Sequence, residues 1–168
     1  WRATQEGVPA VIVNPGVILG TGVEGNPLEL LCNQIDNGLL FYPKGATGYV
    51  TVEDVVQVLT ELMDSETENE RFILVAENWS YEQMLRRIAL IRKKRPPRIG
   101  LRKSWLQIAW GLEGILSLFG KRRFMTQALI SSLCDVKHIQ GNRIIQESSF
   151  KYSDIEAYLI EHATKKTN

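Results

Sequence analysis

Hydrophobic residues along the chain form two kinds of segment, short continuous runs and longer runs with helical spacing. Residues 8–13 (VPAVIV) and 71–76 (RFILVA) are short runs rich in β-branched residues, a pattern typical of strands buried on both faces of a parallel sheet. In residues 51–63 and 80–93 apolar positions recur every three or four residues, which predicts amphipathic helices. A proline in the first turn and a glycine after the end indicate another helix over residues 27–37. This alternation predicts an α/β fold.

Polar residues and prolines predict where several of these elements begin or end. Thr51 is a good helix N-cap, and Asp54 follows three residues later in the capping-box position. Ser153 and Glu156 repeat that spacing, which predicts a C-terminal helix that begins at Ser153. Pro15 has no N–H to donate to a ladder, so we expect the first strand to stop there.

The overall composition is that of one globular domain. The chain has 168 residues, of which 44% are hydrophobic and 23% charged, so it is long enough to bury a core. Its two cysteines and two histidines show no metal-ligand spacing, and we expect neither a metal site nor a disulfide framework. So few cysteines favour a cytoplasmic protein.

The chain opens on WRATQEG, which resembles the last turns of a helix that ends at a glycine. A natural protein rarely begins within a helix and without methionine. We therefore expect these residues to be a fragment of a longer protein.

Residues 20–25 (GTGVEG) match G-x-G-x-x-G, the pattern of a dinucleotide-binding turn. In that turn a strand leads directly into the glycines and the following helix begins within them, so that its N-terminus binds pyrophosphate. Here the strand is expected to end five residues before Gly20, and Pro27 sets the helix start beyond the motif. The region where an acid for the ribose is expected reads LFYPKGATG. We interpret residues 20–26 as a glycine-rich loop instead.

Catalytic motifs are scarce in this sequence. None of the five tyrosines has a lysine four residues later, which short-chain dehydrogenases use to lower the phenol pKa. The serine-nucleophile elbow and the P-loop are also missing. We assign no catalytic residue to the chain.

Positive charge is concentrated between residues 86 and 123, which contain twelve Lys and Arg residues and a single acid, Glu113. The rest of the chain carries eight basic and eighteen acidic residues. Within the basic segment, residues 104–119 predict a helix whose apolar face is wider than one core contact needs. The segment is interpreted as a solvated loop with a core helix, as a surface for a subunit, substrate or membrane, or as a nucleic-acid site. No recognition motif supports the nucleic-acid interpretation.

The order of three segments resembles the C-terminal half of an extended short-chain dehydrogenase/reductase, in the NAD-dependent epimerase/dehydratase family. These segments are the WRATQEG helix end, the strand VPAVIVNPGVILGTG, and GATGYVTVEDVVQVLTELM. RFILVAENWSYEQMLRRIA is similar to the family's next strand and capped helix, and the dihydroflavonol-reductase-like branch looks nearest. The resemblance covers residues 1–95 well and the remainder loosely.

The resemblance implies roles for particular residues. The turn that faces the nicotinamide of NAD or NADP corresponds to Pro15, Gly16 and Val17. The residues that border or close the substrate pocket correspond to Gly20, Thr21, Gly22, Gly48, Tyr49 and Val50. Asp54 matches an acid at the head of the next helix, although helix capping is the interpretation that we favour for it. Asn14 stands where the family usually has arginine, which leaves the contact of that side chain open.

The implied function is that of the substrate-binding C-terminal part of an NAD(P)-dependent epimerase, dehydratase or reductase. Its substrate would be a sugar nucleotide or a small carbonyl or alcohol. Residues 1–76 would end the Rossmann-type core with the nicotinamide-side and substrate loops, and residues 77–168 would form a mostly helical substrate-binding region. The Gly-rich turn and Tyr-x-x-x-Lys would lie in an N-terminal cofactor half, so we expect the chain alone to be inactive.

Two expectations concern partners. Strands over residues 9–13 and 72–76 would lack parallel neighbours, which predicts a homo-oligomer or a dimer that exchanges elements. The alternative function is a non-enzymatic module that binds a membrane surface or a partner through the basic residues 86–123.

Overall fold

The structure is a computed structural model that describes all residues except 1–6, 22–24, 106, 109–125, 149 and 165–168. The elements in chain order are β1 (Ile12–Pro15), β2 (Val17–Leu19), α2 (Pro27–Asp36), β3 (Phe41–Pro43), β4 (Ala46–Thr51), α3 (Val52–Met63), β5 (Arg71–Leu74), β6 (Glu77–Ser80), α4 (Tyr81–Ile91), β7 (Ile99–Leu101), α6 (Gln127–Cys134), α7 (Arg143–Glu147) and α8 (Ile155–His162).

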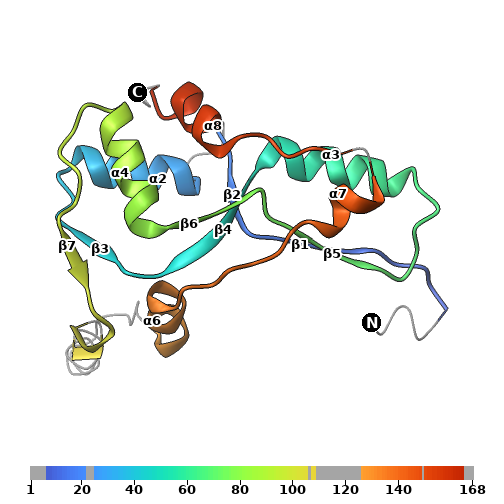
Figure 1. The fold of residues 1–168 in the computed structure, drawn as a ribbon, viewed down its shortest axis with the longest axis horizontal. Coiled ribbons are helices and arrows are strands. Elements are labelled where there is room, and N and C mark those ends of the chain that lie inside the picture. The colour runs from blue at the N-terminus through green and yellow to red at the C-terminus, as the bar shows by residue number, and fades with distance from the viewer. Residues whose placement is uncertain (1–6, 22–24, 106, 109–125, 149, 165–168) are drawn as a thin grey trace.

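The strands form three small sheets within the described residues (Figure 1). In the first sheet β1 pairs in parallel with β5, and in the third β3 pairs in parallel with β7. The second sheet has the order β2-β4-β6, with β2 parallel and β6 antiparallel to β4. These parallel strands, alternating with helices, confirm the α/β fold class.

The helices predicted over residues 27–37, 51–63 and 80–93 are confirmed as α2, α3 and α4. Each begins after a side chain that accepts a hydrogen bond from the first turn: Asn26 caps α2, Thr51 caps α3 and Ser80 caps α4. Such caps satisfy backbone donors that have no partner inside the helix, and each typically contributes about 1 kcal/mol. Local sequence signals therefore define where these helices start.

The first strand corrects the sequence prediction. It runs from Ile12 through Pro15, so Pro15 is its last residue and residues 8–11 lie outside it. The Ile12 N–H donates to the carbonyl of Glu70, just before β5, and the Gly16 N–H donates to the carbonyl of Leu74, at the end of β5. Successive N–H groups of a strand point to opposite edges, so those of residues 13 and 15 would point away from β5. The missing N–H of Pro15 falls on that other side, where it costs no bond to β5. The strand is half-buried or exposed rather than buried on both faces, and no described strand pairs with its second edge.

The N-cap of the last helix lies one residue later than predicted. Asp154 is the N-cap of α8, and its carboxylate accepts a hydrogen bond from the Ala157 N–H. The predicted cap, Ser153, donates instead to the carboxylate of Asp54, through its hydroxyl at 2.7 Å and through its backbone N–H. A bond to a buried carboxylate 99 residues away has therefore replaced the local capping bond.

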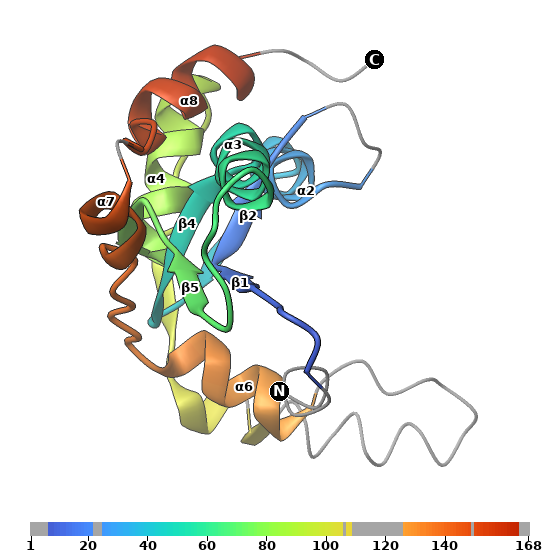
Figure 2. The same ribbon diagram turned by 90° about the vertical axis from the view of Figure 1, so that its right-hand side faces the viewer.

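Side chains on the two faces of β4 enter two different hydrophobic clusters. Tyr49 is buried with residues of β2, α2, α4 and α8, whereas the next residue, Val50, is buried with residues of α3, β5 and α7. Figure 2 shows α8 beside α4, and these helices are in contact. Because adjacent residues of a strand point to opposite faces, β4 joins both clusters.

Most of the helix predicted over residues 104–119 lies outside the described residues. None of the helices in the described part of the chain is long and apolar enough to span a lipid bilayer.

Candidate functional site

The chain passes from the first sheet to the second at the residues predicted to face nicotinamide. Pro15 ends β1 opposite Leu74, and the Gly16 N–H donates to the Leu74 carbonyl at 2.9 Å. Val17 then begins β2, opposite Tyr49 of β4. Pro15 is exposed, and Gly16 and Val17 are half-buried, so the surface of this turn is accessible. Ligands of α/β proteins commonly bind at the carboxyl ends of parallel strands, which is where this turn lies.

Three glycines allow four segments of the chain to approach closely at this crossing. A Cβ atom on Gly16 would lie 2.4 Å from the carbonyl oxygen of Gly48. A Cβ on Gly48 would lie 2.6 Å from the side chain of Val75, and a Cβ on Gly141 would lie 2.6 Å from the backbone of Val75. The crossing therefore requires glycine at all three positions, and Val75 is the buried residue around which they meet.

The structure brings Gly48 to the crossing but buries the two residues after it. The side chains of Tyr49 and Val50 lie in the two hydrophobic clusters. Burial, followed by the effect of Tyr81, raises the pKa of Tyr49, which keeps its phenol neutral. Through these buried side chains, β4 holds the backbone of Gly48 against Gly16.

The loop predicted to border the substrate is described in part. Gly20 packs against Val52, because a Cβ atom on Gly20 would lie only 3.2 Å from that side chain, and Thr21 is exposed. Gly22 lies outside the described residues. The start of the loop is therefore held by packing at Gly20, and the chain is exposed to solvent at Thr21.

Tyr158 of α8 lies beside this loop and was not predicted from the sequence. Burial raises its pKa to about 12, with the Glu53 carboxylate acting in the same direction and Thr21 acting against it. The Tyr158 hydroxyl is buried, and it makes no hydrogen bond of acceptable geometry with the described residues. The phenol ring stacks on His162, with 4.2 Å between the ring centroids.

The helix that follows the glycine-rich loop is not arranged to bind pyrophosphate. The Asn26 side chain accepts a hydrogen bond from the Glu29 N–H at 2.9 Å, and the Glu29 carboxylate accepts one from the Gly25 N–H at 3.0 Å. The first turn of α2 thus has one of its donors occupied and holds a carboxylate of its own, which repels another anion. This geometry supports the interpretation of residues 20–26 as a loop.

A C-terminal segment braces the crossing through contacts that no sequence spacing indicated. The Asn78 amide donates to the Ile139 carbonyl and accepts from the Ile139 N–H, each at 2.9 Å. The Tyr152 hydroxyl donates to the Gly141 carbonyl at 3.1 Å. Asn78 and Ile139 are 61 residues apart, so only the folded chain shows that they meet.

Asp54 serves a different role from the helix cap favoured by the sequence. Its own N–H is bonded to the Thr51 hydroxyl, whereas its carboxylate accepts the two bonds from Ser153. The residue is only 3% exposed. Asp54 therefore fastens the start of α3 to the segment that leads into α8. Within the described residues, no group of three or more His, Cys, Asp or Glu side chains is placed to hold a metal ion.

Comparisons with solved structures show which known folds the chain is similar to. No family model and no curated protein sequence matches the chain. Among solved structures, it is similar to gox2253 (TM-score 0.74, 20% identity, 98% of this chain and 53% of that one). It is also similar to a nucleoside-diphosphate-sugar epimerase from Pseudomonas aeruginosa (TM-score 0.72, 19% identity, 95% and 48%). A human epimerase family protein solved with NADPH gives a TM-score of 0.66 at 18% identity, over 93% and 48%.

These similarities show a shared Rossmann-like α/β fold. The chain spans about half the length of the structures that it matches.

Proposed function

We propose that the chain forms the nicotinamide-facing and substrate-binding part of an NAD(P)-dependent epimerase, dehydratase or reductase. The observation that carries this proposal is the crossing at Gly16, where two parallel strands end beside an accessible turn. The structures that share the fold include one solved with NADPH and one described as a nucleoside-diphosphate-sugar epimerase.

The exposed turn suits the nicotinamide end of the cofactor. Pro15 and Gly16 present a small, rigid surface without a long side chain, on which a flat ring could lie. Gly48 and Val75 hold that surface in place from behind. A bound nicotinamide would supply hydride transfer, and the role of this chain would be to orient the ring and to exclude water from one side.

One edge of β1 pairs with no strand in the described part of the chain, and that edge would accommodate the remainder of a parallel sheet. Because the Ile12 and Gly16 N–H groups donate towards β5, the N–H of Val13 faces the other edge. A strand of a longer polypeptide would pair there, and that polypeptide would carry the Gly-rich turn and the Tyr-x-x-x-Lys that this sequence lacks. Without that strand the chain alone would self-associate, and light scattering at micromolar concentration measures this directly.

The loop at Gly20 and Thr21 suits the substrate side. It leaves β2 next to the crossing, and Thr21 offers an exposed hydroxyl. A hydroxyl at this position fits a polyol or carbonyl substrate, such as a sugar nucleotide or a small alcohol, by donating or accepting a hydrogen bond.

A matched pair of proline variants in the longer polypeptide tests this proposal. Pro15→Trp would fill the space assigned to the nicotinamide ring, whereas Pro96→Trp makes the same change at an exposed proline after α4. We expect Pro15→Trp to weaken NADH or NADPH binding at least about tenfold in a fluorescence titration, and Pro96→Trp to leave it unchanged. Both side chains are exposed, so the melting temperature should stay the same. Equal cofactor affinity in the two variants would refute the assignment.

A further inference from the structure

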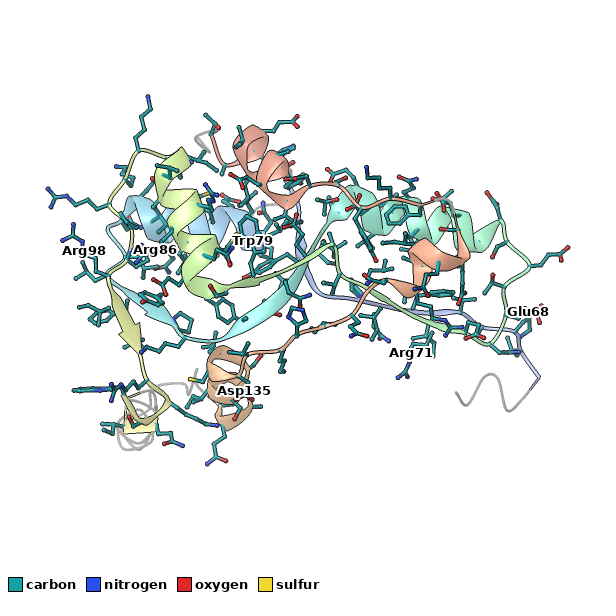
Figure 3. The ribbon with its side chains drawn as sticks, viewed as in Figure 1. Glu68, Arg71, Trp79, Arg86, Arg98 and Asp135 are labelled. Carbon is teal, nitrogen blue, oxygen red and sulfur yellow. The ribbon has the colours of Figure 1, made fainter. Side chains whose placement is uncertain are left out.

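An exposed basic surface extends from the end of α4 to β7. Its cations are Lys93, Lys94, Arg95, Arg98 and Arg102, which are all exposed. None of the five has an ion-pair partner among the residues that the structure describes. Figure 3 shows Arg86 and Arg98 at the same end of the molecule. We call these five cations, with the apolar residues described next, the α4–β7 surface.

Large apolar side chains stand exposed among these cations. The exposed fractions are 60% for Leu40, 45% for Phe41, 68% for Leu90, 50% for Ile99 and 66% for Trp105. Phe41 and Ile99 are paired across β3 and β7, and the N–H groups of Arg98 and Ile99 both donate to the Leu40 carbonyl. Leu90 lines an open pocket of about 360 Å³ together with Lys94. The Trp105 N–H donates to the Arg102 carbonyl, so a single turn of chain joins the tryptophan to the last of the five cations.

The acidic residues near this surface do not neutralise its positive charge. No Asp or Glu occurs between residues 83 and 112. The acids that approach α4 from other elements or from its own first turn are already paired: Asp36 with Arg92, Glu82 with Arg86, and Glu156 with Arg87. The five cations of the α4–β7 surface therefore carry five positive charges that the described residues do not neutralise.

We propose that the α4–β7 surface docks on a membrane of anionic phospholipids. Cations attract the headgroups, and the leucine, isoleucine, phenylalanine and tryptophan side chains between them can enter the interface, where tryptophan is especially favoured. A second copy of the same surface would be repelled by its charge. A nucleic acid would neutralise the cations but would leave the exposed aliphatic side chains in water. This docking does not depend on the proposed NAD(P)-dependent function.

Sedimentation with vesicles tests this proposal on the chain as it stands. The vesicles contain either phosphatidylcholine alone or phosphatidylcholine with phosphatidylserine. We expect binding only to the vesicles with phosphatidylserine, and we expect it to weaken as salt screens the cations. Binding to both kinds of vesicle alike, or to neither, would overturn the proposal.

Charge-reversal variants locate the surface that binds. Lys94→Glu/Arg98→Glu removes two of the five cations, whereas the matched control Lys137→Glu/Lys151→Glu makes the same change in net charge at exposed lysines elsewhere. We expect the first pair to weaken binding at least about 30-fold, since each cation near the surface contributes about fivefold. The control should bind within a few-fold of the unmodified chain.

Apolar variants separate lipid docking from simple charge attraction. Leu90→Ser/Ile99→Ser keeps every cation, and we expect it to bind the vesicles at least about tenfold more weakly. Circular dichroism of each variant should match the unmodified chain, because all the substituted side chains are exposed. Unchanged binding of Leu90→Ser/Ile99→Ser, or tighter binding of the chain to duplex DNA than to the vesicles, would overturn the proposal.

Discussion

Gly16 and Gly48 are in direct backbone contact, since a Cβ on Gly16 would lie 2.4 Å from the Gly48 carbonyl oxygen. Gly16 links the sheet of β1 and β5 to the sheet of β2, β4 and β6, and Gly48 belongs to the middle strand of the second sheet. The contact therefore fixes how the two sheets meet. It also fixes the turn that we propose to face the nicotinamide.

Replacing Gly16 by alanine should destabilise the chain for a steric reason. The added methyl group must push β4 away, and we expect a loss of about 2–4 kcal/mol in the free energy of unfolding, measured by urea denaturation. Gly38→Ala is the control, because Gly38 has φ of 79° but open space around its Cβ position. It should cost only about 1 kcal/mol, from backbone strain alone. If the two variants lose the same stability, the contact with Gly48 has no steric consequence.

Two tyrosine-to-phenylalanine changes should have opposite effects. The Tyr152 hydroxyl donates to the Gly141 carbonyl, so Tyr152→Phe should cost about 1 kcal/mol. The buried Tyr158 hydroxyl has no such bond with the described residues, so Tyr158→Phe should be neutral or stabilising by up to about 1 kcal/mol. Urea denaturation at neutral pH measures both. A marked loss for Tyr158→Phe would show that its hydroxyl has a partner.

Stability should fall at alkaline pH because these phenols titrate late in the folded chain. Burial raises the pKa of Tyr152 to about 12 and that of Tyr158 to about 12, compared with about 10 for an unfolded tyrosine. Between these values the unfolded chain loses protons that the folded chain retains, so the free energy of unfolding decreases as pH rises. We expect it to be unaffected by these groups below about pH 10 and to decline from there towards about pH 12.

Urea denaturation across this pH range checks the expectation. Tyr158→Phe should have a shallower decline than the unmodified chain, because one of the late-titrating phenols is gone. An equal slope in both proteins would mean that Tyr158 titrates normally in the folded state.

Asp54 and Ser153 should show strong coupling in a double-mutant cycle. Asp54→Ala removes a buried carboxylate that accepts two bonds from Ser153, and Ser153→Ala removes the hydroxyl that makes the shorter of them. We expect single losses of about 2–3 kcal/mol and about 1–2 kcal/mol, with a coupling energy above about 1 kcal/mol. Asp154→Ala serves as a control that removes only the local cap of α8. Additive losses for Asp54→Ala and Ser153→Ala would contradict the role assigned to this pair.

The parts of the fold that the sequence predicted are those governed by neighbouring residues. Helices α3 and α4 follow from apolar spacing and from caps three residues away, at Thr51 and Ser80. The predicted cap of α8 was wrong because Ser153 has the local spacing of a cap, while Asp54, which binds it, is 99 residues distant. The loop interpretation of residues 20–26 rested partly on Pro27, which does lie in the first turn of α2. Its other ground, a strand that ends five residues before Gly20, was wrong, because β2 leads directly into Gly20.

The candidate site was predicted only through family resemblance. Pro15, Gly16 and Gly48 carry no chemistry in their side chains, so composition and motif searches give them no weight. Their importance comes from a crossing that Val75 and Gly141 complete, and those two residues are distant in sequence. Neighbouring residues in the sequence do not indicate a close backbone contact of this kind. A glycine that packing requires cannot be distinguished in the sequence from a glycine in a flexible loop.

Side-by-side cofactor titration tests the central claim most directly. NADH and NADPH are added in turn to the 168-residue chain and to the longer polypeptide in which we propose that it is embedded. We expect saturable binding of at least one cofactor by the longer polypeptide only, and hydride transfer from that cofactor to an added carbonyl substrate by the longer polypeptide only. Turnover by the 168 residues alone, or no binding of either cofactor by the longer polypeptide, would contradict it.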